Sequence, residues 1–176
     1  MAEADLSAAR LHSLLKYTPE TGLFHRLVPQ GGQVVGAIAG STDPVNGYVR
    51  IGVDGHSYKA HRLAWFYVHG VWPPMLIDHK NLNRSDNRLD NLRPATVQQN
   101  NQNVVAPRRD SRSGYRGVSW LAAQQSWRAT ITVNGKQKHL GYFVTPEEAS
   151  TAYLDAKSSL HPFAACPTLN ASRADS

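Results

Sequence analysis

Residues 76–103 read LIDHKNLNRSDNRLDNLRPATVQQNNQN, and most of the side chains able to do chemistry in this 176-residue chain are concentrated there. Asp78 and His79 follow an apolar run, an Asn-rich loop comes next, and Thr96 opens a predicted short helix that carries Asn100. Oxygen donors and one imidazole, without a nearby cysteine, suit a hard divalent cation such as Mg²⁺ better than zinc. Metal-assisted hydrolysis of a phosphodiester needs such groups, because the ion neutralises developing charge and the imidazole takes a proton from water.

The string Asp78-His79, Asp86-Asn87-Arg88, Asn91-Leu92-Arg93 and Asn100 resembles, in residue type and spacing, the HNH endonuclease motif of phage and intron-encoded nucleases. The resemblance implies a ββα-metal fold, in which a short hairpin and a helix surround one ion. An Asn-rich loop alone indicates little, since Asn and Asp side chains cap backbone groups in ordinary loops. The joint pattern is therefore what supports a nuclease.

The same resemblance implies a role for each matching residue. Asp78 and Asn100 would bind the metal, Mg²⁺ or Mn²⁺, and His79 would be the general base. Asn91 would bridge the loop and orient His79. Some family members have His at the position of Asn91, whereas the variant found in phage enzymes has Asn, as here. Asn91 is accordingly expected to be structural and not a ligand.

Composition is consistent with a globular protein that binds a polyanion. The chain is 41% hydrophobic and 18% charged, with 19 Lys and Arg against 13 Asp and Glu. Residues 1–60 carry five charges of each sign, so the basic excess lies later in the chain. The single cysteine, Cys166, excludes a disulfide or a Cys-ligated zinc site within one chain. No long apolar run or signal-peptide layout is present, so we expect a cytoplasmic location in a bacterial or phage-infected cell.

Residues 1–105 are predicted to form the HNH domain, with a β-rich scaffold before the motif. The expected elements are a helix over 5–17, a strand over 23–27, an apolar run over 34–39, a hairpin over 48–60 that turns at Asp54-Gly55, a helix over 61–70 and a strand ending at Ile77. Arg50 and Lys59 are candidates for DNA-backbone contacts, although solvated strand faces explain them equally. His61 could lie near the metal site or touch a phosphate. Alternatively, it starts its helix and is satisfied by backbone groups.

Residues 106–114 lose periodicity and are predicted to be a basic linker. Arg108, Arg109 and Arg112 could follow a DNA backbone between two modules without reading sequence. A solvated charged linker accounts for them as well.

Residues 115–163 are predicted to form a second module. The run SWRATITV over 126–133 alternates apolar and polar residues, Asn134-Gly135 predicts a tight hairpin, and the capping box from Thr145 to Glu148 opens a helix with an apolar stripe. The helix is expected to cover one face of the sheet and to leave a polar, basic face suited to base edges in the major groove.

The segments YRGV (115–118), WRATI (127–131), LGYF (140–143) and TPEEASTAY (145–153) resemble the APETALA2/ethylene-response-factor DNA-binding domain. The resemblance implies a three-stranded sheet, packed on one helix, whose alternating residues contact DNA. The corresponding positions are Arg116, Ser119, Trp120, Arg128, Thr130, Thr132, Gln137 and His139. Several of them are Arg or Trp in the plant proteins, so the plant target sequence does not transfer. Residues 164–176 are expected to form a loose tail.

The sequence thus predicts an α+β protein: a β-rich scaffold with a ββα-metal HNH motif, then a small three-stranded antiparallel sheet packed on one helix. The expected function is metal-dependent, site-specific cleavage or nicking of double-stranded DNA, in the manner of a homing endonuclease, by a monomer or weak dimer. The alternative is a sequence-specific DNA-binding regulator whose HNH fold is a scaffold without turnover.

Overall fold

The computed structural model describes residues 5–104, 106–107 and 109–164. The chain divides into two compact units, residues 1–97 and 98–176. Among the described residues, the first unit contains three small antiparallel sheets and the second contains one. Helices α2 to α5 and these small sheets confirm the predicted α+β class. The predicted domain boundary at residue 105 stays a prediction.

The first unit opens with α2 (Ala8–Leu14), which Ser7 caps by accepting a hydrogen bond from the backbone N–H of Arg10. The predicted continuation of this helix to residue 17 is wrong. The chain instead turns into β1 (Leu15–Thr18), which pairs with β2 (Leu23–Arg26). Leu15 and Tyr17 alternate into the core, so strand pairing overrides the local leucine pattern.

A second sheet has the order β3 (Ser41–Thr42), β4 (Val49–Val53), β5 (His56–Lys59). The predicted hairpin is confirmed, and both of its turn residues have positive φ, 46° at Asp54 and 79° at Gly55. Residues 34–39 form no regular strand beyond a single bridge from Ile38 to His25. Helix α3 (Ala60–His69) follows and ends at Gly70, whose φ is 69°.

The third sheet of this unit is the hairpin β6 (Leu76–His79) and β7 (Leu92–Ala95), followed in sequence by α4 (Val97–Asn103). This is the strand–strand–helix order of the expected motif. β6 extends two residues further than predicted, because it pairs with β7 through His79 and Leu92. Side chains from the helices and sheets of this unit form its core, including Leu11, Phe24, Ile51, Leu63, Phe66 and Ile77.

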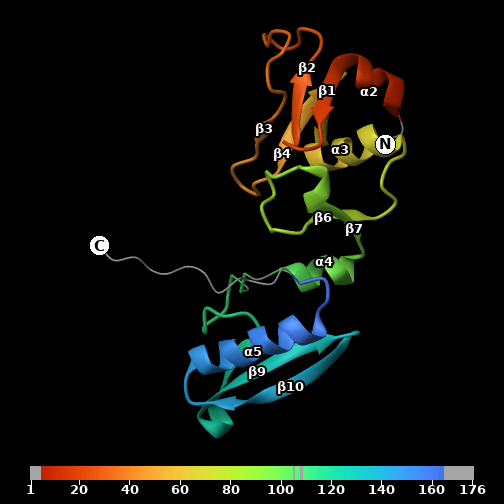
Figure 1. The fold of residues 1–176 in the computed structure, drawn as a ribbon. Coiled ribbons are helices and arrows are strands. Elements are labelled where there is room, and N and C mark those ends of the chain that lie inside the picture. Colours follow the sequence, from red (N-terminus) through yellow and green to blue (C-terminus); the bar gives the residue numbers. More distant parts are fainter. Residues whose placement is uncertain (1–4, 105, 108, 165–176) are drawn as a thin grey trace. The chain divides into compact units, whose positions relative to one another are not determined.

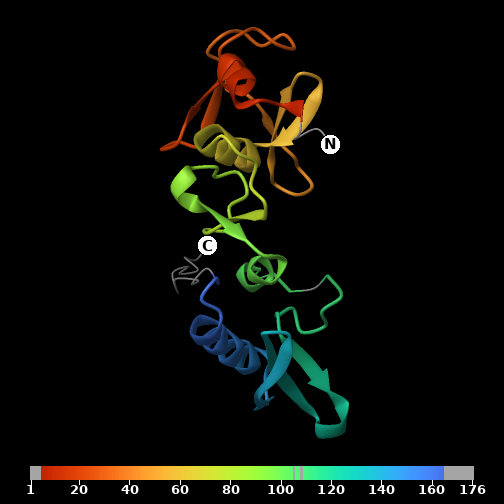
Figure 2. The ribbon, with the colours of Figure 1, turned by 90° about the vertical axis from the view of Figure 1, so that its right-hand side faces the viewer.

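The second unit contains the sheet β10 (Lys136–Phe143), β9 (Ser126–Val133), β8 (Val118–Leu121), with α5 (Pro146–Leu160) lying across one face (Figures 1 and 2). Thr145 and Glu148 form the predicted capping box. Ala129 and Ala149 are fully buried, which allows close approach of helix and sheet.

Some predictions fall outside the part of the chain that the structure describes. They concern Arg108, Cys166 and the tail beyond residue 164. Among the residues that are described, no helix is both long enough and apolar enough to span a bilayer.

Candidate active site

Asp78 and His79 occupy the last two positions of β6, and both are buried. The hairpin register puts Asp78 opposite Arg93, whose Nε and Nη2 donate to Asp78 Oδ2 at 3.0 and 2.8 Å. Charge-assisted bonds of this kind hold a carboxylate in one orientation. Asp78 is therefore fixed next to His79 by a residue of the partner strand.

His79 is held by Asn87, a residue for which spacing alone predicted no role. His79 Nε2 lies 3.3 Å from Asn87 Oδ1, while Asn87 Nδ2 donates to the carbonyl of Ser85 at 3.0 Å. That second bond orients the amide so that its oxygen faces the imidazole. Nε2 must then carry the proton and donate it, which makes Nδ1 the basic nitrogen of His79.

The surroundings of His79 keep its imidazole neutral. Burial lowers the pKa of His79 below its usual value, and the positive charge of Arg84 acts in the same direction. The hydrogen bond to Asn87 and the carboxylates of Asp78 and Asp86 oppose this change without reversing it. A neutral imidazole at neutral pH is the form that a general base requires.

Two further rings border His79. The centroid of His61 lies 5.0 Å from that of His79, and Tyr48 lies 5.2 Å from His61 and 6.0 Å from His79. Burial lowers the pKa of His61 to about 3, and the neighbouring His79 adds to the effect. Among the described residues, no atom pairs with His61 Nδ1. Of the two interpretations offered for His61, the structure supports a place beside the candidate site.

Asn91 closes the loop that carries Asn87. Its Oδ1 accepts the backbone N–H of Asn81 at 3.0 Å, and its Nδ2 donates to the carbonyl of Asp86 at 2.8 Å. The side chain is buried, and both bonds are partly shielded from water. Asn91 thus bridges the loop, while the hydrogen bond to His79 comes from Asn87.

The N-terminal strands hold the same loop from outside. The Tyr17 hydroxyl donates to the carbonyl of Asn87 at 2.7 Å, and the backbone N–H of Leu89 donates to the carbonyl of Pro19 at 3.1 Å. Gly22, with φ 72°, lies so close that a Cβ there would meet the backbone of Asn87 and Arg88. The β1–β2 turn is therefore part of what positions Asn87.

The predicted metal ligands belong to different units. Asp78 lies in the first unit, and Asn100 lies on α4 in the part assigned to the second. Within the described ranges, no group of three or more His, Cys, Asp or Glu could hold a metal ion. A metal at this site would need amide oxygens as well as Asp78, a donor set that suits a hard cation.

Comparison with known proteins places this site in a family. A family model described as HNH endonuclease matches residues 58–102. Protein 3.8 of Escherichia phage T7 is 38% identical over 84 residues, which cover 46% of this chain and 69% of that protein. The chain belongs to the HNH endonuclease family. The matched residues run from β5 through most of α4 and include His61, Asp78, His79 and Asn91. No solved structure matches this HNH protein.

The second unit of the HNH protein presents a polar sheet face. Strand register places Ser119, Arg128 and Tyr142 in one row, Thr130 opposite His139, and Thr132 opposite Gln137. Arg128 Nη2 donates to Ser119 Oγ at 3.5 Å, and Gln137 Nε2 donates to Thr130 Oγ1 at 3.2 Å. Six of the predicted DNA-contacting residues therefore share one face. The APETALA2 resemblance itself stays a prediction.

Two predicted members of this face lie elsewhere in the second unit. Trp120 pairs with Trp127, one position from the outward Ser119–Arg128 pair, so it points to the helix side of the sheet. Arg116 precedes β8 and donates to the carbonyls of Asn101 and Ala106 at 3.4 Å.

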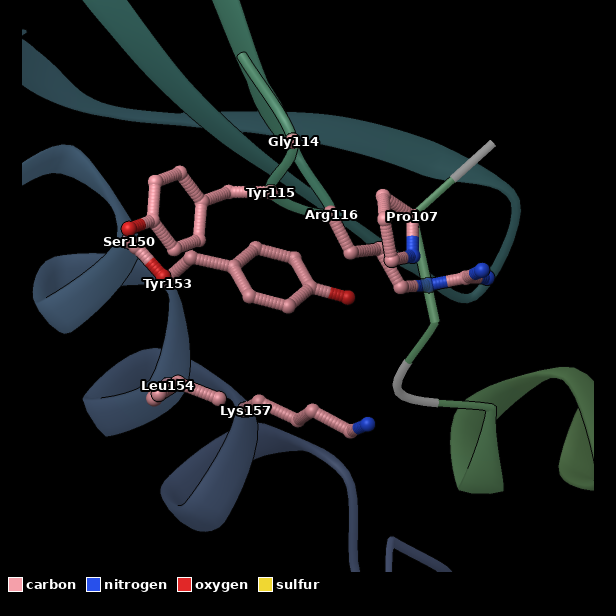
Figure 3. Close-up of a pocket in the computed structure, with 8 residues that line it drawn as sticks. All are labelled: Pro107, Gly114, Tyr115, Arg116, Ser150, Tyr153, Leu154 and Lys157. Atoms are coloured by element: carbon pink, nitrogen blue, oxygen red, sulfur yellow. The ribbon is translucent and has the colours of Figure 1, made fainter. Parts of the chain in front are cut away.

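Arg116 lines a pocket together with Tyr153 and Lys157 of α5 (Figure 3). Lys157 Nζ donates to the carbonyl of Val104 at 2.9 Å, and burial, aided by Arg116, lowers its pKa to about 8. These contacts tie the segment before β8 to α5. In the predicted linker, Arg109 is exposed.

Proposed function

We propose that this HNH protein is a metal-dependent endonuclease or nicking enzyme that cuts double-stranded DNA at specific sites. The observation that carries the proposal is the buried, neutral His79, bonded through Nε2 to Asn87 and placed beside Asp78. A fixed tautomer with a basic Nδ1 is what abstraction of a proton from water requires.

In the proposed reaction, His79 Nδ1 takes the proton of a water molecule whose oxygen attacks the phosphorus. The bond to the 3′ oxygen breaks, and this oxygen takes up a proton from solvent. The products carry 5′-phosphate and 3′-hydroxyl ends, as the family resemblance implies. Mg²⁺ or Mn²⁺ would be held by Asp78 and Asn100, as the family resemblance implies, and would neutralise the charge that develops on the phosphate and the leaving oxygen. Arg93 holds Asp78 in place through Oδ2.

The sheet of the second unit is proposed to bind DNA and to direct cleavage to its target. Arg128 and His139 supply donors on one face, together with the amide of Gln137 and the hydroxyls of Thr130 and Thr132. Groups of this kind can read base edges in the major groove. Tethering such a reader to the HNH unit raises the local concentration of the active site near its target. We propose a monomer or weak dimer, in which one active site cuts one strand at a time.

The second candidate is a DNA-binding regulator without turnover, and the polar sheet face favours it equally. Incubating supercoiled plasmid carrying phage and host fragments with Mg²⁺, or with EDTA, separates the two. Relaxed or linear plasmid that forms only with Mg²⁺ supports the endonuclease. Tight gel shifts on the same DNA, with intact supercoils in both Mg²⁺ and Mn²⁺, support the regulator.

A further inference from the structure

Two cations converge on the tyrosine ring that borders His79. Lys59 Nζ lies 4.6 Å from the centroid of Tyr48, and Arg84 Cζ lies 4.9 Å from the same centroid. Lys59 comes from the end of β5 and Arg84 from the loop after β6. Segments distant in sequence therefore bring two positive charges to the same aromatic ring, at the edge of the candidate active site.

These two cations differ from the four arginines of the first unit that pair with carboxylates. Other arginines of the first unit pair with carboxylates (Arg10 with Asp54, Arg50 with Asp43, Arg88 with Asp86, Arg93 with Asp78) or donate to backbone carbonyls (Arg26 and Arg62). Within the part of the chain that the structure describes, neither Lys59 nor Arg84 forms an ion pair with a carboxylate.

Arg84 is nevertheless held in place. Its Nη1 donates to the carbonyl of Asn46 at 2.9 Å, and this bond uses one of its five N–H groups. The tyrosine ring attracts both cations, but such a contact is weaker than pairing with a full negative charge. A phosphate oxygen would therefore be a stronger partner for either cation.

The charges of both cations act on the two buried histidines of the candidate site. Lys59 contributes to the lowered pKa of His61, and Arg84 contributes to the lowered pKa of His79. The centroid of Tyr48 lies 6.0 Å from that of His79, so a phosphate bound by the cations at this ring would lie close to the proposed general base.

We propose that Lys59, Arg84 and Tyr48 form a phosphate clamp that binds the DNA backbone beside the phosphodiester cut at His79. The inference rests on the proposed endonuclease function and names the residues of the HNH unit that hold its substrate. Arg84 supplies a planar group that can bind two phosphate oxygens, and Lys59 supplies a point charge. Arg50, the other candidate from the scaffold, is engaged by Asp43 at 3.7 Å.

The salt dependence of DNA binding tests the clamp. Full-length protein with His79→Ala, which keeps the DNA intact, is titrated onto a mixed-sequence duplex in Mg²⁺ at several salt concentrations. Each phosphate contact contributes about 0.9 to the slope of log K against log salt. We expect Lys59→Gln and Arg84→Gln each to reduce this slope by about one, and the double variant by about two. Lys16→Gln, which removes an exposed lysine of β1, should leave the slope unchanged.

Conservative variants and thermal melts keep the result interpretable. Lys59→Arg and Arg84→Lys should melt as the parent does and restore most of the slope, because they keep the charge. Slopes that stay at the parent value in both glutamine variants would overturn the clamp, even if the wild-type protein cuts plasmid. Reduced slopes in a protein that cuts nothing would support the clamp and count against the endonuclease.

Discussion

The rings of His61 and His79 meet nearly edge to face, with centroids 5.0 Å apart and planes at 86°. Each side chain is buried, and His61 comes from α3 while His79 ends β6. A proton on His61 would place a positive charge against the proposed general base. The lowered pKa of His61 prevents this at neutral pH.

The buried His61 predicts a pH-dependent stability. Its pKa in the folded protein, about 3, lies below the ordinary value of 6.5, so the unfolded chain takes up the proton first as pH falls. Above pH 6.5, His61 is neutral in both states and does not reduce the stability of the folded protein. As the pH falls from 6.5 toward the folded pKa, protonation of the unfolded chain progressively lowers the free energy of unfolding. Between these values the wild type should lose up to about 1.4 kcal/mol of unfolding free energy per pH unit relative to His61→Gln. Urea unfolding across this range measures the difference. The exposed His56→Gln serves as control, and parallel curves for wild type and His61→Gln would refute the assignment.

The bond between Asn87 and His79 predicts a pH–rate profile. Because cleavage needs neutral His79, the rate should rise with pH, through a pKa below 6.5, to a plateau at neutral pH. In the wild type, the hydrogen bond to Asn87 fixes the tautomer of His79 and raises its pKa. Asn87→Ala removes this acceptor, so the pKa of His79 should fall. We expect a rate at least about tenfold lower and an acid limb displaced to lower pH. Asn83→Ala is the control, since Asn83 bonds only within its own exposed turn. Equal rates for Asn87→Ala and wild type would exclude the proposed role.

The packing of Gly22 against the Asn87–Arg88 backbone predicts a long-range effect of a small substitution. Gly22→Ala should lower the cleavage rate and the melting temperature, because the new Cβ displaces the backbone that carries Asn87. Gly31 also has positive φ, 59°, but no heavy atom lies within 4 Å of the position of its Cβ. Gly31→Ala therefore reports the backbone strain alone, about 1–2 kcal/mol. A cleavage rate equally affected by both would show that the β1–β2 turn does not position Asn87.

The sheet of the second unit offers a test of which face binds DNA. Arg128→Ala should weaken binding of a target duplex by about tenfold, since a good base contact contributes about 1–3 kcal/mol. Lys138→Ala is the matched control: Lys138 is opposite Ile131, so its side chain points to the helix side. Fluorescence anisotropy gives both affinities. A larger loss for Lys138→Ala than for Arg128→Ala would contradict the proposed face.

Local chemistry decided which elements could be predicted from the sequence. The hairpins at Asp54-Gly55 and Asn134-Gly135 and the start of α5 follow from turn and capping residues within a few positions. The end of α2 could not be predicted, because Leu15 leaves the helical pattern only through the pairing of β1 with β2, in which it lies opposite Arg26.

In the candidate site, too, the sequence predicted local features, whereas contacts between distant segments required the structure. The motif predicts the chemistry of Asp78 and His79, and the structure adds the contacts of Asn87 and His61 with His79, which depend on distant segments meeting. Trp120 was misplaced because strand register, and not residue type, decides which face a side chain occupies.

The most direct test is the rate of plasmid nicking by His79→Ala in Mg²⁺, measured beside wild type and the exposed-histidine control His56→Ala. The proposed mechanism predicts that wild type and His56→Ala relax the plasmid at similar rates. It predicts that His79→Ala is slower by about 10²–10⁴-fold and binds DNA as tightly as wild type. Cleavage by His79→Ala at the wild-type rate would contradict the assignment of His79 as the general base.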